Sequence, residues 1–201
     1  MASSSYVPET EEQRNARWQK YVGETEQLIK DDSLDEAEHA GLRALELAES
    51  YVRDDQRVGI TLELLSQIYY RSRKYHYGAP VMMRLLQLYR RRLGQDHLDT
   101  GTITHNAALL YHAWRKVDEA GVFYQQAMYI KSAKLGLEHP AVEQIRDDYA
   151  TYLKDAAEKD AFRVSYKPLP DERLSDALGE RPKDERFTLS GQFDSLPKEL
   201  L

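Results

Sequence analysis

Three histidines are the side chains whose spacing could hold a metal ion. His105 and His112 are seven residues apart and would share one face of a helix, with His97 shortly before them. An imidazole is a common zinc ligand. The chain has no cysteine, and no histidine and glutamate stand in the close arrangement of a zinc hydrolase. We therefore predict no metal site and no cofactor.

His97 has a second interpretation, because His139 stands 42 residues after it in a similar local sequence. Both histidines are expected in turns that join repeated units. Recurrence of one residue type in such a turn indicates a structural role, in capping a helix or in hydrogen bonding within the turn.

No other pattern indicates catalysis. The sequence contains no nucleophile elbow, phosphate loop or dinucleotide fingerprint, and the lack of cysteine excludes thiolate chemistry. The acidic pairs Asp31-Asp32 and Asp54-Asp55 fall where turns between helices are expected, as solvated helix breakers do. We predict that the protein is not an enzyme and has no catalytic residues.

Charge and hydropathy exclude two classes of partner. The net charge of -6 argues against general affinity for nucleic acid, which depends on Lys and Arg neutralising phosphates. No apolar run is long enough to span a membrane, so we expect a soluble, cytoplasmic protein.

The densest basic run is Arg90-Arg91-Arg92. It is expected at the C-terminal end of a helix, where the helix dipole stabilises positive charge; a weak contact with phosphate is the alternative.

A 42-residue period organises the chain. The sequence LGQDH at 93–97 recurs as LGLEH at 135–139, and Tyr69 with Tyr70 recurs as Tyr111 with His112. An upstream copy follows the same period with one deletion, since the DEA of 35–37 recurs at 118–120, one position short of two full periods. Such a period is typical of stacked structural repeats.

Apolar residues within each unit recur at helical spacing, so each unit is expected to be two antiparallel helices. The predicted helix pairs are 14–30 with 34–53, 58–72 with 75–93, and 99–114 with 117–135, followed by a last helix at 140–160. Small residues at matching places, such as Ala37, Gly78 and Ala120, would let helix axes approach closely, while Tyr69 and Tyr124 would fill the core.

The third unit resembles the tetratricopeptide repeats, in their 42-residue kinesin-light-chain-like variety. The matching segments are NAALLYH at 106–112, VDEA at 117–120, YQQA at 124–127 and LGLEHP at 135–140. The first unit is irregular, because Glu24 and Gly41 stand where bulky apolar residues are usual. The resemblance implies a right-handed α-solenoid of about three repeats plus a terminal helix, with a concave face that receives a partner peptide or protein.

Mapping that concave face onto the chain gives a predicted binding groove. Its residues are Glu63, Gln67, Tyr70, Arg71, His105, Asn106, Leu109, His112, Asp147 and Thr151. An asparagine at the place of Asn106 can hydrogen-bond a peptide backbone. The mapped side chains are acidic or neutral apart from Arg71, which favours a partner with some basic character and apolar or aromatic anchors.

The two ends differ from the repeats. Residues 1–13 are expected to be disordered, residues 14–163 form the repeat domain, and residues 164–201, rich in proline and charge, are expected to be a largely disordered tail. The tail carries spaced apolar groups, including Phe187 and Phe193, and could return to the groove and block it.

The leading hypothesis is therefore an interaction adaptor or scaffold. One alternative is a regulatory sensor whose groove takes a small peptide or ligand. Another is a structural protein that self-associates through the exposed terminal helix, near Tyr149, Tyr152 and Leu153.

Overall fold

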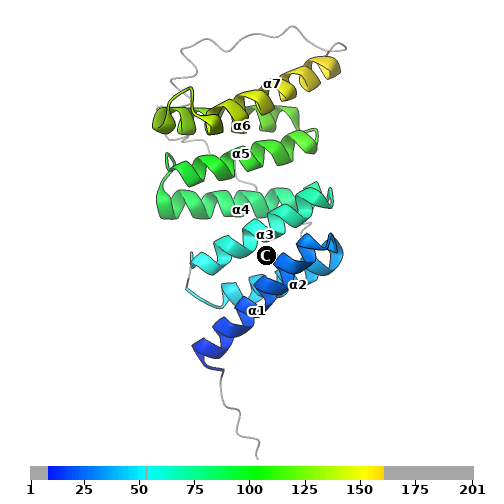
Figure 1. The fold of residues 1–201 in the computed structure, drawn as a ribbon, viewed down its shortest axis with the longest axis vertical. Coiled ribbons are helices and arrows are strands. Elements are labelled where there is room, and N and C mark those ends of the chain that lie inside the picture. Colours follow the sequence, from blue (N-terminus) through cyan, green and yellow to red (C-terminus); the bar gives the residue numbers. More distant parts are fainter. Residues whose placement is uncertain (1–8, 53, 161–201) are drawn as a thin grey trace, which may run out of the picture.

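The computed structural model describes residues 9–52 and 54–160, and all regular structure in this part of the chain is α-helical (Figure 1). The helices are α1 (Glu11–Lys30), α2 (Leu34–Glu49), α3 (Gln56–Arg71), α4 (Tyr75–Leu93), α5 (Leu98–Ala113), α6 (Val117–Leu135) and α7 (Pro140–Asp160). The predicted all-α fold is confirmed. The tail at 164–201 and its suggested return to the groove lie outside the described residues.

The helices stack one after another along a single long axis (Figure 1). Each helix packs against the helix before it and the helix after it, and α1 also contacts α3 as α5 contacts α7. The odd-numbered helices therefore form one layer and the even-numbered helices the other. This is the two-layered arrangement of an α-solenoid, in which each pair buries its faces against its neighbours.

The turn inside each helix pair recurs at the repeat spacing. Asp32, Arg73 and Arg115, which follow α1, α3 and α5, have positive φ angles of 59°, 58° and 63°. A residue other than glycine rarely adopts this left-handed conformation. Its return at the same place in each unit shows that one turn geometry is used three times.

The side chains that cap the odd-numbered helices also recur. Asp55 Oδ1 accepts a hydrogen bond from the backbone N–H of Arg57 at 2.9 Å, and His97 Nδ1 accepts one from Asp99 at 3.2 Å. His139 Nδ1 accepts one from Ala141 at 3.1 Å. The predicted capping role of His97 and His139 is confirmed. Asp55 occupies the same place in the preceding unit as His97 and performs the same task with a carboxylate.

Capping also explains where the helix ends differ from the predicted ones. Thr10 and Gln13 exchange hydrogen bonds in a capping box, so α1 begins at Glu11 and not at residue 14. Asp55 caps α3, which begins at Gln56 and not at 58. The second helix, α2, ends at Glu49, before the expected 53, and the Ser50 hydroxyl hydrogen-bonds the carbonyl oxygen of Leu47.

Small residues bring the helices into close contact, as predicted. Ala37, Gly78 and Ala120 are all buried, and a Cβ added to Gly78 would lie 3.0 Å from both Leu110 Cδ1 and Tyr69 Cβ. Gly78 therefore lets α4 approach α3 and α5 at the same point. Tyr69 and Tyr124, which were predicted for the core, are buried, and so is Tyr111.

Gly41 and Gly101 make similar contacts. A Cβ on Gly41 would lie 2.9 Å from Leu65 Cδ2, so this glycine in the irregular first unit is a place of tight packing between α2 and α3. A Cβ on Gly101 would lie 2.9 Å from Ile130 Cγ2 on α6, and Gly59, at the same place in the preceding unit, faces Leu88 on α4. In the pairs α3–α4 and α5–α6, therefore, a glycine of the first helix lies directly against the second helix.

Replacing Gly78 tests this packing. We expect Gly78→Val to lower the free energy of unfolding by about 1–3 kcal/mol, because the added methyl groups would overlap Leu110 and Tyr69. Gly23→Val is the matched control, since a Cβ at this exposed position of α1 meets nothing within 4 Å. Urea unfolding followed by helical circular dichroism measures both, and equal effects would contradict the packing argument.

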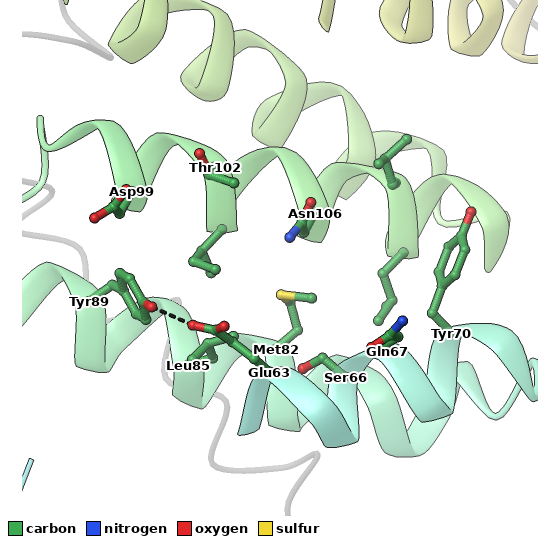
Figure 2. Close-up of a pocket in the computed structure, with 13 residues that line it drawn as sticks. Glu63, Ser66, Gln67, Tyr70, Met82, Leu85, Tyr89, Asp99, Thr102 and Asn106 are labelled. Carbon is green, nitrogen blue, oxygen red and sulfur yellow. Dashed lines mark hydrogen bonds between the residues drawn. The ribbon is translucent and has the colours of Figure 1, made fainter. Parts of the chain in front are cut away.

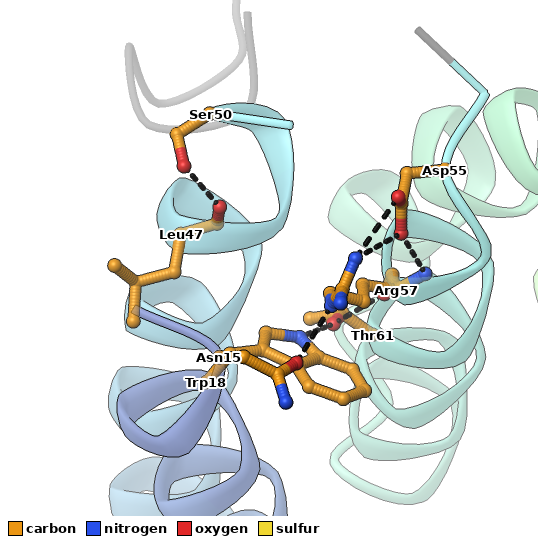
Figure 3. A network of polar contacts seen from close by, with 7 residues as sticks. All are labelled: Asn15, Trp18, Leu47, Ser50, Asp55, Arg57 and Thr61. Carbon is orange, nitrogen blue, oxygen red and sulfur yellow. Dashed lines mark hydrogen bonds and ion pairs between the residues drawn. The ribbon is translucent and has the colours of Figure 1, made fainter. Parts of the chain in front are cut away.

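A partly buried polar network joins α1 to α3 (Figure 3). The Trp18 indole N–H donates to the Thr61 hydroxyl at 3.1 Å, and that hydroxyl donates to the carbonyl oxygen of Arg57 at 2.8 Å. The Arg57 guanidinium bonds Asn15 Oδ1 at 2.9 Å and pairs with Asp55 at 3.0 Å. The helix cap, the first helix and the third helix are thus connected through one arginine.

Thr61→Val keeps the shape of this side chain and removes its hydroxyl. We expect a loss of about 1–3 kcal/mol in the free energy of unfolding, because the buried Trp18 N–H would have no acceptor. Thr151→Val is the control: its hydroxyl also bonds a carbonyl oxygen four residues back, but it is exposed. A loss at position 61 no larger than that at position 151 would show that the Trp18 contact contributes little.

Candidate functional site

A pocket of about 570 Å³ opens between α3 and α5, above α4 (Figure 2). Its lining residues are Glu63, Ser66, Gln67, Tyr70, Met82, Leu85, Tyr89, Asp99, Thr102, Ile103, Asn106, Leu109 and Leu110. The three helices each supply part of the wall. This volume is within the range of pockets that hold small ligands or parts of a bound peptide.

The pocket has an apolar lining and a polar rim. Met82 and Leu85 of α4 are buried, as are Ile103 and Leu110 of α5. The exposed rim carries amides, hydroxyl groups and carboxylates from α3 and α5. An apolar group that enters the pocket is therefore removed from water, while polar groups beside it can still hydrogen-bond.

Ser66 is the polar side chain buried within this wall. It is 4% exposed, and its hydroxyl oxygen has no hydrogen-bond partner among the described residues. A buried polar atom without a partner costs about 1–3 kcal/mol, so most such atoms in proteins are paired. The Ser66 hydroxyl is thus a buried polar group without a partner among the described residues, in a residue that lines the pocket.

Glu63 and Tyr89 close one end of the pocket. The Tyr89 hydroxyl donates a hydrogen bond to Glu63 Oε1, which ties the rim of α3 to α4 (Figure 2). Burial, followed by this hydrogen bond and the negative charge of Glu63, raises the pKa of Tyr89 to about 12. The hydroxyl therefore stays protonated at neutral pH and holds the carboxylate in place.

Half of the predicted groove residues come together in the pocket. Glu63, Gln67 and Tyr70 line it from α3, and Asn106 and Leu109 line it from α5. Figure 2 shows Gln67 and Asn106 on opposite sides of the opening. The predicted role of these side chains in binding remains a prediction, but their arrangement around one cavity is observed.

Arg71 faces away from the pocket. Its guanidinium donates to the carbonyl oxygen of Ile29 at 2.7 Å and to the Asp32 carboxylate at 2.7 Å. The carbonyl oxygens at the end of α1 have no partner inside their own helix, and Arg71 supplies one. It holds α1 to α3.

His105 and His112 contact α7. His105 is 8% exposed, and its Nε2 lies 3.0 Å from Asp148 Oδ2, without the alignment of a good hydrogen bond. His112 Nε2 lies 3.1 Å from Asp155 Oδ2, and its Nδ1 lies 3.2 Å from the Tyr124 hydroxyl. Two His–Asp contacts therefore connect α5 to α7. The two histidines are seven residues apart on α5, and the two aspartates are seven residues apart on α7.

Asp147 and Thr151 are exposed on α7 and do not line the pocket. The Thr151 hydroxyl donates to the carbonyl oxygen of Asp147 at 3.0 Å, within the same helix. The predicted groove is thus divided, with α3 and α5 forming a pocket and α7 presenting a separate surface.

The sequence mapping missed the floor of the pocket. Met82, Leu85 and Tyr89 belong to α4, whereas the predicted groove residues all belong to α3, α5 and α7. Thr102 and Asp99 were also missed, although they lie on α5 one and two turns before Asn106. Helical spacing from Asn106 could have found both, whereas the Glu63–Tyr89 contact has no local signal.

The described part of the chain contains no group of three or more His, Asp or Glu side chains placed to hold a metal ion. None of its helices combines the length and the apolar character needed to cross a bilayer.

The arginines at the end of α4 contact side chains of other elements. Arg90 donates to Gln126 Oε1 at 3.1 Å, and Arg91 pairs with Asp54 at 2.6 Å.

The end helix is more covered than expected. Tyr152 is buried, and its hydroxyl donates to the carbonyl oxygen of Val117 at 2.8 Å. Tyr149 is partly buried and accepts a hydrogen bond from Gln125 at 3.0 Å. Of the three residues suggested for self-association, Leu153 is the exposed one.

Comparison with known proteins supports the fold. No protein-family profile matches the sequence, and no curated protein matches it. The structure is similar to the crystal structure of BtubC (BKLC) from P. vanneervenii, with a TM-score of 0.58 and 16% sequence identity over 84% of this chain and 81% of that chain. The likeness shows a tetratricopeptide-like helical repeat fold.

Acidification tests the environment of His105. Burial lowers the pKa of His105, against the opposing effect of Asp148, so the unfolded chain takes up a proton at this site more readily. The free energy of unfolding should therefore fall as the pH drops below about 6.5, by at most about 1.4 kcal/mol for each pH unit from this residue. The slope should be smaller in His105→Gln.

His76→Gln is the control for this experiment, because His76 is exposed on α4. Urea unfolding between pH 7.5 and 5 gives the slopes, with the pH range chosen from the ordinary pKa of histidine at about 6.5. Equal slopes for the unaltered chain and His105→Gln would mean that Asp148 compensates fully for the burial.

Proposed function

We propose that this protein is an interaction scaffold that binds a segment of a partner protein in the pocket between α3 and α5. The proposal is supported by the pocket itself, which combines buried apolar side chains with an exposed rim of amides, hydroxyl groups and carboxylates. A helical repeat fold supports an interaction role in general. We further propose that the repeats are of the 42-residue variety, as the recurring caps and turns suggest.

The amides of the rim suit a polypeptide ligand. Gln67 and Asn106 stand on opposite walls, and each side chain offers both a donor and an acceptor. An extended peptide presents N–H and C=O groups along its length, so both amides can bind its backbone while one of its side chains enters the apolar interior.

The lining argues for binding and against catalysis. The Ser66 hydroxyl has no hydrogen-bond partner among the described residues, and none of the thirteen lining side chains is a histidine or lysine. Activation of a serine nucleophile requires such a base. We place the protein in the cytoplasm, because a chain without cysteine fits a reducing compartment.

Asn106→Trp should block the pocket without disturbing the core, because Asn106 is exposed on the rim. Heptapeptides displayed on phage are selected on the full chain and then tested against two variants. We expect selected peptides to lose binding to Asn106→Trp and to keep it with Gln87→Trp, an exposed position of α4 that does not line the pocket. Peptides that bind both variants equally, or no selected peptides, would contradict the proposal.

A further inference from the structure

The charged side chains of the pocket are both acidic. Glu63 and Asp99 are the charged residues among its lining, and they lie at the same end with Tyr89 between them (Figure 2). Two carboxylates at one end of an apolar pocket disfavour an anionic ligand and attract a cation.

One oxygen of Glu63 is available. The Tyr89 hydroxyl bonds Oε1, and no described residue donates a hydrogen bond to Oε2 or forms an ion pair with Glu63. The carboxylate is exposed, but it is held in place by a partly buried tyrosine. A fixed carboxylate with a free oxygen is a prepared acceptor for an ammonium or guanidinium group.

The cations of the neighbouring helices are placed elsewhere. Arg91 pairs with Asp54, and Arg92 lines an adjoining hollow of about 230 Å³ that shares Tyr89 and Asp99 with the pocket. Lys131 packs its stem against Gly101, on the side of α5 that faces α6. Arg92 and Lys131 thus stand near Asp99, whereas Glu63 forms no ion pair with a described residue and the lining of the pocket contains no lysine or arginine.

The distance between the acidic end of the pocket, at Glu63, and its apolar interior, at Met82, determines the spacing of the two peptide side chains that can occupy both places. Glu63 and Gln67 are one helical turn apart, about 6 Å along α3, and Met82 and Ser66 lie beside Gln67 (Figure 2). In an extended peptide, side chains on the same face are two residues apart and separated by about 6.6 Å. The two spacings match.

We infer that the pocket binds an extended peptide in which an apolar side chain enters beside Ser66 and Met82, and an arginine or lysine two residues away meets Glu63. The inference rests on the proposed binding function and names the chemistry of its ligand. Tyr89 acts as a positioning residue, because it holds the Glu63 carboxylate. An aspartate or glutamate at the same place of the peptide would be repelled by Glu63 and Asp99.

The test is a focused library of nine-residue peptides with leucine fixed at the centre and the positions two residues before and after it randomised. Selection on the full chain should enrich arginine or lysine at one of these two positions, and the enriched side shows the direction of the bound peptide. The most enriched peptide is then synthesised with a fluorescent label, together with versions that carry glutamate or serine in place of the basic residue.

Fluorescence anisotropy measures the affinity of each peptide. We expect the glutamate version to bind at least tenfold more weakly than the basic one. Glu63→Gln keeps an acceptor for Tyr89 and removes the charge, so it should weaken the basic peptide about fivefold or more and leave the serine version unchanged. Glu46→Gln, at an exposed position of α2 outside the pocket, should leave all three peptides unchanged.

The outcomes separate the two proposals. Enrichment of neutral or acidic residues, or a basic peptide whose affinity ignores Glu63→Gln, would overturn the charge inference; the binding function would stand if Asn106→Trp still abolishes binding. A library from which no peptide is retained would overturn both. Circular dichroism of each variant confirms that it is folded.

Discussion

The close approach of neighbouring helices at small residues is the constraint on which the other features depend. Gly78 brings α4 against Tyr69 of α3 and Leu110 of α5 at once, so the second layer bridges two units of the first. Because α4 lies this close beneath them, its side chains Met82 and Leu85 become the inner wall of the space between α3 and α5. The pocket is therefore a product of helix packing, and its shape depends on residues outside it.

Polar contacts then decide which helices of the first layer are joined. Trp18 with Thr61 and Arg71 with Ile29 hold α1 to α3, and His105 and His112 hold α5 to α7. Between α3 and α5 the same layer carries the pocket. The first layer thus consists of two linked pairs of helices with the candidate binding site at the place where they meet.

The repeats were predictable because they depend on local chemistry that returns once in every unit, as in the caps His97 and His139. Half of the predicted groove residues line the pocket. Periodicity places Arg71 and His105 on the same layer as Glu63, but it does not reveal that they contact Ile29 and Asp148 instead of lining the pocket, since these partners are distant in sequence. Gly41 was interpreted as an irregularity of the first unit, and only the position of Leu65 shows that the helices need this space.

The glycine at which the first helix of a pair contacts the second is not repeated on α7. Gly59 and Gly101 are followed at the next repeat step by Glu143, an exposed residue of α7. A helix packed on α7 as α4 packs on α3 would have to bury this carboxylate, and burying an unpaired charge is strongly unfavourable. A single position per repeat thus sets how closely the two helices of a pair approach, and on α7 this position carries a charge instead of a glycine.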